Sequence, residues 1–172
     1  MSTLADRPFE EAFSATMRRE GGYQLHQVEG DAGGLTYAGI ARNRNPQWPG
    51  WAYVDRGETP PTEMVRAFYR ANYWQPIRGD ELRSDIAASI FDFGVNAGPR
   101  LAVKLAQAVA RVEADGVMGP RSLAALNAMS PAAFAGAYAL AKVKRYADIC
   151  NRDPSQRKFL LGWINRTLGA LG

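Results

Sequence analysis

The sequence predicts a predominantly helical α+β fold with a small β-hairpin element near the N-terminus. Apolar side chains recur at three- and four-residue spacing over residues 8–20 and over most of the chain after residue 62, which is typical of amphipathic helices. Between these regions, Tyr23–Ile40 loses the helical period and is interrupted by glycines, as short hairpins are. The 172 residues contain no internal repeat and no flexible linker. We therefore expect a single structural unit.

The elements are expected in the following order. The first helix ends at Gly21-Gly22, the hairpins follow, and a loop rich in proline and tryptophan covers residues 43–56. Trp74 closes an amphipathic segment and is expected in the core. The remaining helices are expected over residues 62–74, 82–97, 100–113, 120–128, 130–150 and 153–168.

Composition excludes several classes of site. Cys150 and His26 are the only residues of their types, so the chain can form neither an intrachain disulfide nor a zinc site with several imidazole or thiolate ligands. There is no Gly-x-Ser-x-Gly elbow for a serine hydrolase, and a Cys150/His26 pair competes with a buried, inert thiol. No metal and no cofactor is implied. The net charge of +4 favours polyanions without selecting among nucleic acid, anionic lipid and acidic wall polymers.

Glu20 is the first candidate for chemistry. At ~100° per residue it falls on the apolar face of the first helix, directly before the two glycines. Partial burial and the negative end of the helix dipole both raise the pKa of such a carboxyl group. A glycosidase needs an acid that is still protonated near neutral pH. The alternative is that a glutamate before Gly-Gly only marks a helix end.

Asp31 is the candidate for a second carboxylate, one that stays ionised and orients water. It lies in a polar, glycine-rich hairpin, where backbone N–H groups and solvent can hold its charge. The Thr36 hydroxyl, five residues further on, is placed to help position that water. Asp-x-Gly-Gly is also typical of a plain turn, and that alternative stays open.

These motifs resemble the signature of glycoside hydrolase family 108. Glu20-Gly21-Gly22-Tyr23 and the segment 31–40 resemble its N-terminal blocks, and residues 71–74 and 91–99 resemble later ones. The turn 115–120 is similar to one in the peptidoglycan-binding-like region that completes many members, although it also serves as a simple helix connection. The family comprises N-acetylmuramidases found as phage endolysins and as secretion-associated cell-wall enzymes. The resemblance, from about Phe9 to Leu168, implies a lysozyme-like fold and hydrolysis of the β-1,4 bond between N-acetylmuramic acid (MurNAc) and N-acetylglucosamine (GlcNAc).

Carried over by position, the resemblance implies Glu20 as general acid, with Asp31 and Thr36 as the supporting pair, as in phage-type lysozymes. The glutamate-to-aspartate gap is usually shorter in the family, so Glu29 competes with Asp31 for the second role. Asp31 is favoured because it keeps its register to the following glycines and Thr36. A carboxyl separation of ~6.5–9.5 Å gives inversion and ~5–5.5 Å gives retention. The likeness to phage-type lysozymes favours inversion.

Aromatic and amide side chains near these blocks are candidates for sugar contacts. The tyrosines flank the site motifs and compete with hairpin packing, while two tryptophans lie in the proline- and glycine-rich loop. The asparagine stands before a Gly-Pro helix stop, so a helix-capping role competes with recognition of a substrate amide. The candidate substrate-binding residues are Tyr23, Tyr37, Trp48, Trp51 and Asn96.

The resemblance further implies a catalytic lobe over residues 1–80 and a helical, peptidoglycan-binding-like lobe over residues 81–172, packed as one unit with the cleft between them. Peptidoglycan glycan strands are the expected partner, and we expect a monomer. A basic cluster is either a solvated helix face or a surface attracted to the anionic envelope. Its members are Lys142, Lys144, Arg145, Arg152, Arg157 and Lys158.

The N-terminal 19 residues carry no apolar signal region, and no segment approaches ~18 apolar residues, so neither a secretory signal nor stable membrane insertion is expected. We expect synthesis in the bacterial cytoplasm and action in the periplasm or cell wall after passage through a holin pore or dedicated export. A phage endolysin and a secretion-associated muramidase both fit. A lytic transglycosylase, a non-catalytic peptidoglycan-binding protein and a nucleic-acid-binding module are rival functions, and the chain shows no helix-turn-helix or RNA-binding signature for the last.

Overall fold

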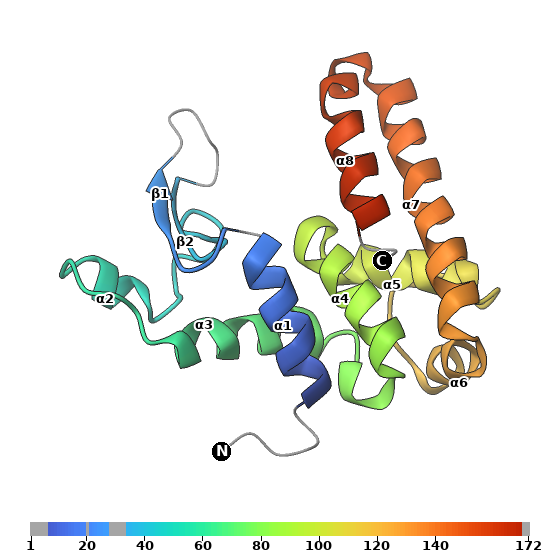
Figure 1. Cartoon of the computed structure of the whole chain (residues 1–172), viewed down its shortest axis with the longest axis horizontal. Coiled ribbons are helices and arrows are strands. Elements are labelled where there is room, and N and C mark those ends of the chain that lie inside the picture. Colours follow the sequence, from blue (N-terminus) through green and yellow to red (C-terminus); the bar gives the residue numbers. More distant parts are fainter. Residues whose placement is uncertain (1–6, 20, 28–33, 170–172) are drawn as a thin grey trace. The chain divides into compact units, whose positions relative to one another are not determined.

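The computed structural model describes residues 7–19, 21–27 and 34–169 (Figure 1). Contacts divide the chain into two compact units, with the division between Gln75 and Pro76. The first unit carries a small antiparallel sheet together with helices, and the second is helical. The predicted fold class is therefore confirmed: a predominantly helical α+β fold with a small β element near the N-terminus.

Helix α1 (Arg7–Arg19) is amphipathic as the sequence predicts, and its apolar face is buried. It packs against α3 (Thr62–Tyr69), which continues as a π-helical turn, η2 (Arg70–Trp74). Phe9 meets Trp74 edge-on at 5.5 Å between ring centroids, and Phe13 meets Tyr69 at the same distance. Trp74 has no exposed surface, so its prediction as a core residue is confirmed.

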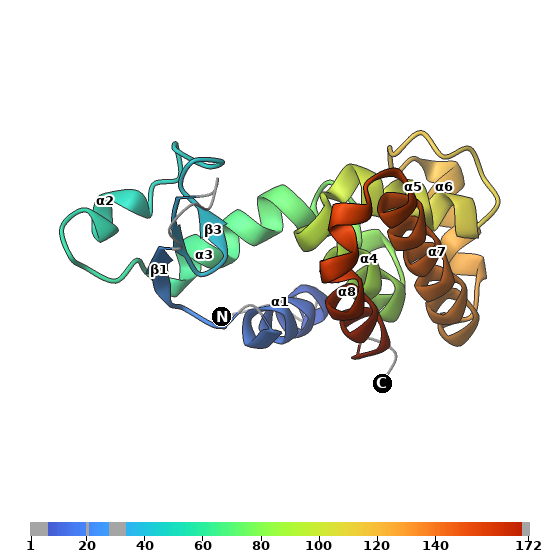
Figure 2. The same ribbon diagram turned by 90° about the horizontal axis from the view of Figure 1, so that it is seen from above.

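The sheet contains three short antiparallel strands in the order β1 (Leu25–Gln27), β2 (Leu35–Tyr37) and β3 (Ile40–Ala41). The turn from β2 to β3 places Ala38 and Gly39 at φ +48° and +78°, the backbone of a type I′ hairpin. The Tyr69 hydroxyl donates a hydrogen bond of 3.0 Å to the Ala38 carbonyl. This buried bond fastens the hairpin to α3, beside which the strands lie (Figure 2).

The loop predicted over residues 43–56 contains a short helix, α2 (Trp51–Val54). The Trp51 indole N–H donates to the Asn45 carbonyl at 2.7 Å, and the Arg42 guanidinium lies 5.2 Å from the centroid of the Trp51 ring. Arg42 also makes a two-point ion pair with Asp55, at 2.6 and 2.8 Å. These contacts hold the segment in a fixed conformation that its composition alone does not reveal.

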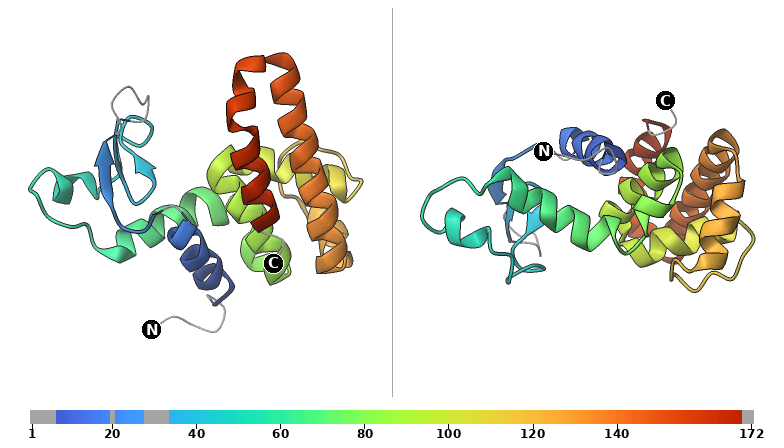
Figure 3. Two further views of the ribbon diagram at one scale, coloured as in Figure 1. Left: turned by 45° about the horizontal axis from the view of Figure 1, so that its top comes forward. Right: turned by 90° about the horizontal axis from the view of Figure 1, so that it is seen from below.

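The second unit consists of helices joined by tight turns. Helix α4 (Ser84–Ala97) turns into α5 (Pro99–Val109) at Gly98, which has φ +88°. Both helices pack against α7 (Pro131–Arg152), and α8 (Arg157–Gly169) runs back along α7 (Figure 3). The remaining short elements are η3 (Gly79–Glu81), α6 (Pro120–Ala128) and η4 (Pro154–Gln156).

Gln107 holds the turn between α5 and α6. Its side chain is 1% exposed, and the two N–H groups of its amide are shared among three acceptors: the Asp115 carboxylate at 2.8 Å, the Val117 carbonyl at 3.0 Å and the Ser122 hydroxyl at 2.9 Å. Its amide oxygen accepts from the Gly116 N–H at 2.8 Å. The turn 115–120 thus has a structural role as the connection between two helices.

The helices were also compared with the length and apolar character that a membrane-spanning helix needs. In the described ranges, no helix by itself has both the length and the apolar character to cross a bilayer, whereas segments 120–127 and 131–152, bent by 115°, meet that criterion jointly.

Cys150 is a buried free thiol near the end of α7. This placement agrees with the interpretation of Cys150 as inert.

Candidate active site

Helix α1 ends where the sequence predicts, beside the candidate acid. Gly21 and Gly22 have φ of +85° and +76°, and the Gly22 N–H donates to the Met17 carbonyl at 2.8 Å. This is a Schellman-type C-cap, and glycine adopts two successive positive φ angles without strain. Glu20 itself lies outside the described residues, so its role as general acid stays a prediction.

Thr36 lies on the central strand of the sheet, paired with His26 on β1 and Ala41 on β3. It is 9% exposed, and its hydroxyl donates to the Gly34 carbonyl at 3.3 Å. That bond orients the hydroxyl and leaves its oxygen lone pairs to accept a hydrogen bond from water. Asp31 and its competitor Glu29 lie outside the described residues, and the choice between them stays a prediction.

The two candidate tyrosines differ in exposure. Tyr23 is 41% exposed and offers a ring surface to a ligand. Partial burial raises the pKa of Tyr23, and nearby Tyr37, Glu10 and Glu63 raise it further. Tyr37 is 4% exposed, stacks on Trp48 at 6.0 Å, and has a buried hydroxyl with no hydrogen-bond partner among the described residues. Hairpin packing therefore accounts for Tyr37, whereas Tyr23 remains open for a sugar.

A cavity of about 530 Å³ lies between the loop 44–49 and helix α3 in the first unit. Trp48 and Phe68, whose ring centroids are 6.4 Å apart, supply its aromatic surface. Gln47 and Asn72 supply side-chain amides. Asn72 donates to the Phe68 carbonyl at 2.8 Å, which leaves its side-chain oxygen for a ligand. Aromatic faces with a few convergent polar groups suit a sugar ring.

The structure separates the two candidate tryptophans. Trp48 is 7% exposed and reaches the cavity, whereas Trp51 is 3% exposed and meets the Trp48 ring edge-on at 5.1 Å. Trp51 is thus positioned to support Trp48. Sequence reasoning missed Gln47 and Phe68 as lining residues. The available signals were that Gln47 is next to Trp48 in the sequence and that Phe68 is four residues, about one helical turn, before Asn72.

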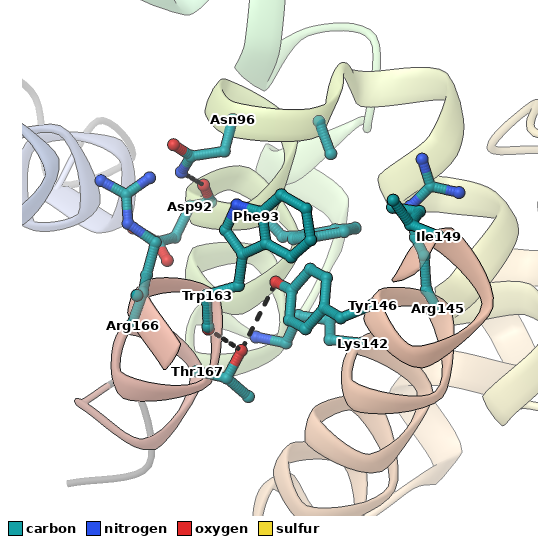
Figure 4. A pocket seen from close by; sticks show the side chains of 12 residues that line it. Asp92, Phe93, Asn96, Lys142, Arg145, Tyr146, Ile149, Trp163, Arg166 and Thr167 are labelled. Atoms are coloured by element: carbon teal, nitrogen blue, oxygen red, sulfur yellow. Dashed lines mark hydrogen bonds between the residues drawn. The ribbon is translucent and has the colours of Figure 1, made fainter. Parts of the chain in front are cut away.

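Asn96 lies on α4, and so belongs to the second unit, whereas the candidates described above belong to the first. Its amide donates to the Asp92 carbonyl at 3.0 Å within the helix, and the helix ends at Gly98, whose N–H donates to the Gly94 carbonyl. The helix-capping alternative is therefore wrong, because Gly98 forms the cap. Asn96 lines a second cavity instead (Figure 4).

The part of the chain that the structure describes contains no cluster of metal ligands. No three His, Cys, Asp or Glu side chains gather there in a group able to hold an ion. The described candidates for binding carry aromatic, amide and hydroxyl groups, which suit a sugar through stacking and hydrogen bonds.

Comparison with known proteins gives two family matches and several similar solved structures. The family model described as Glycosyl hydrolase 108 matches residues 13–98, and the model described as Predicted Peptidoglycan domain matches residues 101–168. One of these is the solved structure of Brucella abortus SagA, which is 23% identical in sequence and superposes with a TM-score of 0.66. The match covers 96% of the present chain and 97% of the SagA chain. This likeness shows a shared fold. No curated protein matches the chain significantly.

Proposed function

We propose, from the premise that this chain belongs to the glycosyl hydrolase 108 family, that it is an N-acetylmuramidase cleaving the β-1,4 bond between MurNAc and GlcNAc. The family and the peptidoglycan domain make the chain a glycoside hydrolase that acts on peptidoglycan. One observation carries the finer proposal. The family match spans residues 13–98 and so includes Glu20, Asp31 and Thr36.

In the proposed reaction, Glu20 gives its proton to the glycosidic oxygen as the bond from that oxygen to C1 of MurNAc breaks. Asp31 accepts a proton from a water molecule, and the oxygen of that water attacks C1 from the opposite face. Thr36 helps to hold the water, and its bond to the Gly34 carbonyl supports this role by orienting the hydroxyl. The product is a MurNAc reducing end with inverted configuration.

Sugar binding is proposed for the open tyrosine and the aromatic cavity of the first unit. Tyr23 supports this role through its exposed ring, and Trp48 with Phe68 through their place on the 530 Å³ cavity. The amides of Gln47 and Asn72 are suited to hydrogen bonds with sugar hydroxyl and N-acetyl groups.

Clearing of outer-membrane-permeabilised cells tests the chemistry. Glu20→Gln removes the acid and should lower the rate by ~10²-fold or more. Glu11→Gln is the matched control, because Glu11 lies on α1 with its side chain 64% exposed and paired with Arg7. Asp31→Asn and Glu29→Gln, compared in the same assay, assign the second carboxylate.

Product analysis separates hydrolysis from its nearest rival. A muramidase leaves reducing MurNAc ends, and a lytic transglycosylase leaves anhydro ends that mass spectrometry distinguishes. Anhydro ends alone, full activity of Glu20→Gln, or binding of sacculi without cleavage by the wild-type protein would each overturn the proposal.

A role as a phage endolysin is proposed for the biological setting, with a secretion-associated muramidase as the alternative. The resemblance to a family that includes phage endolysins supports it. Cytoplasmic expression with and without a holin tests the route: lysis only with the holin is expected, and lysis that ignores the holin would contradict it.

A further inference from the structure

A cavity of about 460 Å³ lies within the second unit, between α4, α7 and α8 (Figure 4). Its walls come from residues 92–97, 142–149 and 162–167. The first of these segments belongs to the hydrolase match and the other two to the peptidoglycan-domain match. The two family segments therefore build one cavity together, and among the described residues none of those proposed for the hydrolytic reaction lines it.

Basic side chains outnumber acidic ones on this cavity. Lys142 is 5% exposed, and its ammonium group lies 5.7 Å from the centroid of the Phe93 ring. The side chain of Arg145, one turn further along α7, makes no hydrogen bond or ion pair with any other residue in the described part of the chain. Figure 4 shows Arg145 and Arg166 on opposite sides of the cavity, and Asp92 is the one carboxylate among the described residues that line it. This arrangement favours an anionic ligand.

Aromatic rings form the rest of the cavity. Tyr146 and Trp163 pack with their ring centroids 5.2 Å apart, and Phe93 lines the same cavity. The Thr167 hydroxyl donates to the Trp163 carbonyl at 3.0 Å, and its oxygen is left to accept from the Tyr146 hydroxyl 3.5 Å away, so both residues are held in place. A ligand that uses these walls must bring apolar groups as well as negative charge, because rings gain from burying methyl and methylene groups. A phosphodiester polymer offers the charge but little apolar surface.

We propose that this cavity binds the acidic stem peptide that peptidoglycan carries on its MurNAc residues. A peptide carboxylate lies against the guanidinium of Arg145, and the small apolar groups of the peptide lie against Trp163 and Tyr146. Asn96, at the rim, is placed to accept a peptide N–H through its side-chain oxygen. The choice of peptidoglycan as the source of the peptide rests on the proposed function. The cavity adds recognition of the peptide to recognition of the glycan.

Gly162 allows the cavity to be blocked without removing any existing contact. It lines the cavity on α8, one helical turn before Arg166, and a Cβ added there meets no atom within 4 Å. Gly162→Leu should therefore fill the space. Gly136→Leu is the matched control, because Gly136 also lies within a helix with no atom near an added Cβ and is not a lining residue. Neither variant should lower the thermal unfolding temperature, since leucine favours helix over glycine.

Titration calorimetry on the full chain compares three probes: the disaccharide GlcNAc-MurNAc carrying a tetrapeptide, the same disaccharide without peptide, and glycerol phosphate. We expect the peptide-bearing probe to bind most tightly. Gly162→Leu should weaken it by about tenfold or more, and Arg145→Gln by about five- to tenfold through loss of a charge-assisted hydrogen bond. Gly136→Leu should bind as the wild type does. The Trp163 indole N–H signal in NMR should shift only with the peptide-bearing probe.

Several outcomes would overturn the proposal. If the peptide-free disaccharide bound as tightly as the peptide-bearing one, the cavity would not recognise the peptide. If glycerol phosphate bound most tightly, the cavity would be assigned to an anionic wall polymer or a lipid headgroup. Lys144→Gln is a charge-matched control, because Lys144 lies next to Arg145 with its side chain 78% exposed. If Lys144→Gln weakened binding of the peptide-bearing probe as much as Arg145→Gln does, the loss would come from the general positive charge of the surface and not from a contact with Arg145. The probe lacks the MurNAc-GlcNAc bond, so Glu20→Gln must bind it normally even if the proposed hydrolysis fails.

Discussion

Gln107→Met tests how much the α5–α6 turn depends on one buried amide. Methionine keeps a similar volume and helix propensity but removes every hydrogen bond of the side chain. The amide of Gln107 donates to Asp115, Val117 and Ser122 and accepts from Gly116, all within 3.0 Å. The exposed Asp115 carboxylate regains water when the amide is lost, whereas the Ser122 hydroxyl is buried.

The expected cost follows from that difference. A hydrogen bond whose partner is rehydrated is worth about 1 kcal/mol, and a buried group left unpaired costs about 1–3 kcal/mol. We therefore expect Gln107→Met to lower the free energy of unfolding by about 2–4 kcal/mol. Urea unfolding by circular dichroism measures the change, and amide exchange in α5 and α6 locates it. Gln75→Met, at an exposed position, should cost less than ~0.5 kcal/mol.

Acid sensitivity gives a second signature of the same turn. The Val117 N–H and then the Gln107 amide lower the pKa of Asp115 below its ordinary value. A carboxyl whose pKa is lowered by folding contributes stability at neutral pH, and that contribution is lost as the pH falls through the lowered pKa. Gln107→Met should therefore weaken the loss of stability in acid. An unfolding free energy within ~0.5 kcal/mol of the wild-type value, with unchanged acid sensitivity, would refute this reasoning.

Two further substitutions probe the second unit. Gly116 has φ +81°, and an added Cβ would lie 2.9 Å from the Arg100 carbonyl oxygen, so Gly116→Ala should lower the free energy of unfolding by about 1–3 kcal/mol. Gly136→Ala, within a helix, should raise it instead. Thermal unfolding measures both variants, and equal melting temperatures would contradict this. Burial raises the pKa of Tyr138 well above its ordinary value, and its hydroxyl donates to the Ala102 carbonyl at 3.0 Å. Because the unfolded chain ionises this tyrosine near pH 10 and the folded chain only at higher pH, wild-type stability should fall as the pH rises above about 10. Tyr138→Phe should cost about 1 kcal/mol at pH 7 and flatten that alkaline decline, and an unchanged alkaline slope would contradict the assignment.

Helical periodicity was sufficient to predict most of the fold. The buried face of α1 and the glycine cap after Arg19 were predicted from local sequence, because both depend on residues within two turns of one another. Helix α2 was missed because four residues are too few to show a period. The burial of Trp51 was missed because it depends on Asn45 and on the Arg42–Asp55 pair rather than on composition.

The candidate site divides in the same way. Glu20 and Thr36 could be proposed from helix position and motif, since each signal is local in the sequence. The two cavities could not, because each forms only when separate helices or loops pack together. Arg145 and Arg166, for example, lie on different helices, and in the sequence both belong to ordinary basic helix faces.

The compact units do not follow the boundary between the family segments. Helix α4 lies inside the hydrolase match, yet it packs against α5 and α7 within the unit that begins at Pro76. Its core residues Ile86 and Ile90 have no exposed surface, so separation of the chain after residue 98 would leave this apolar face uncovered. The hydrolase segment and the peptidoglycan domain therefore share a hydrophobic core, and a peptide bound in the 460 Å³ cavity touches both segments at once.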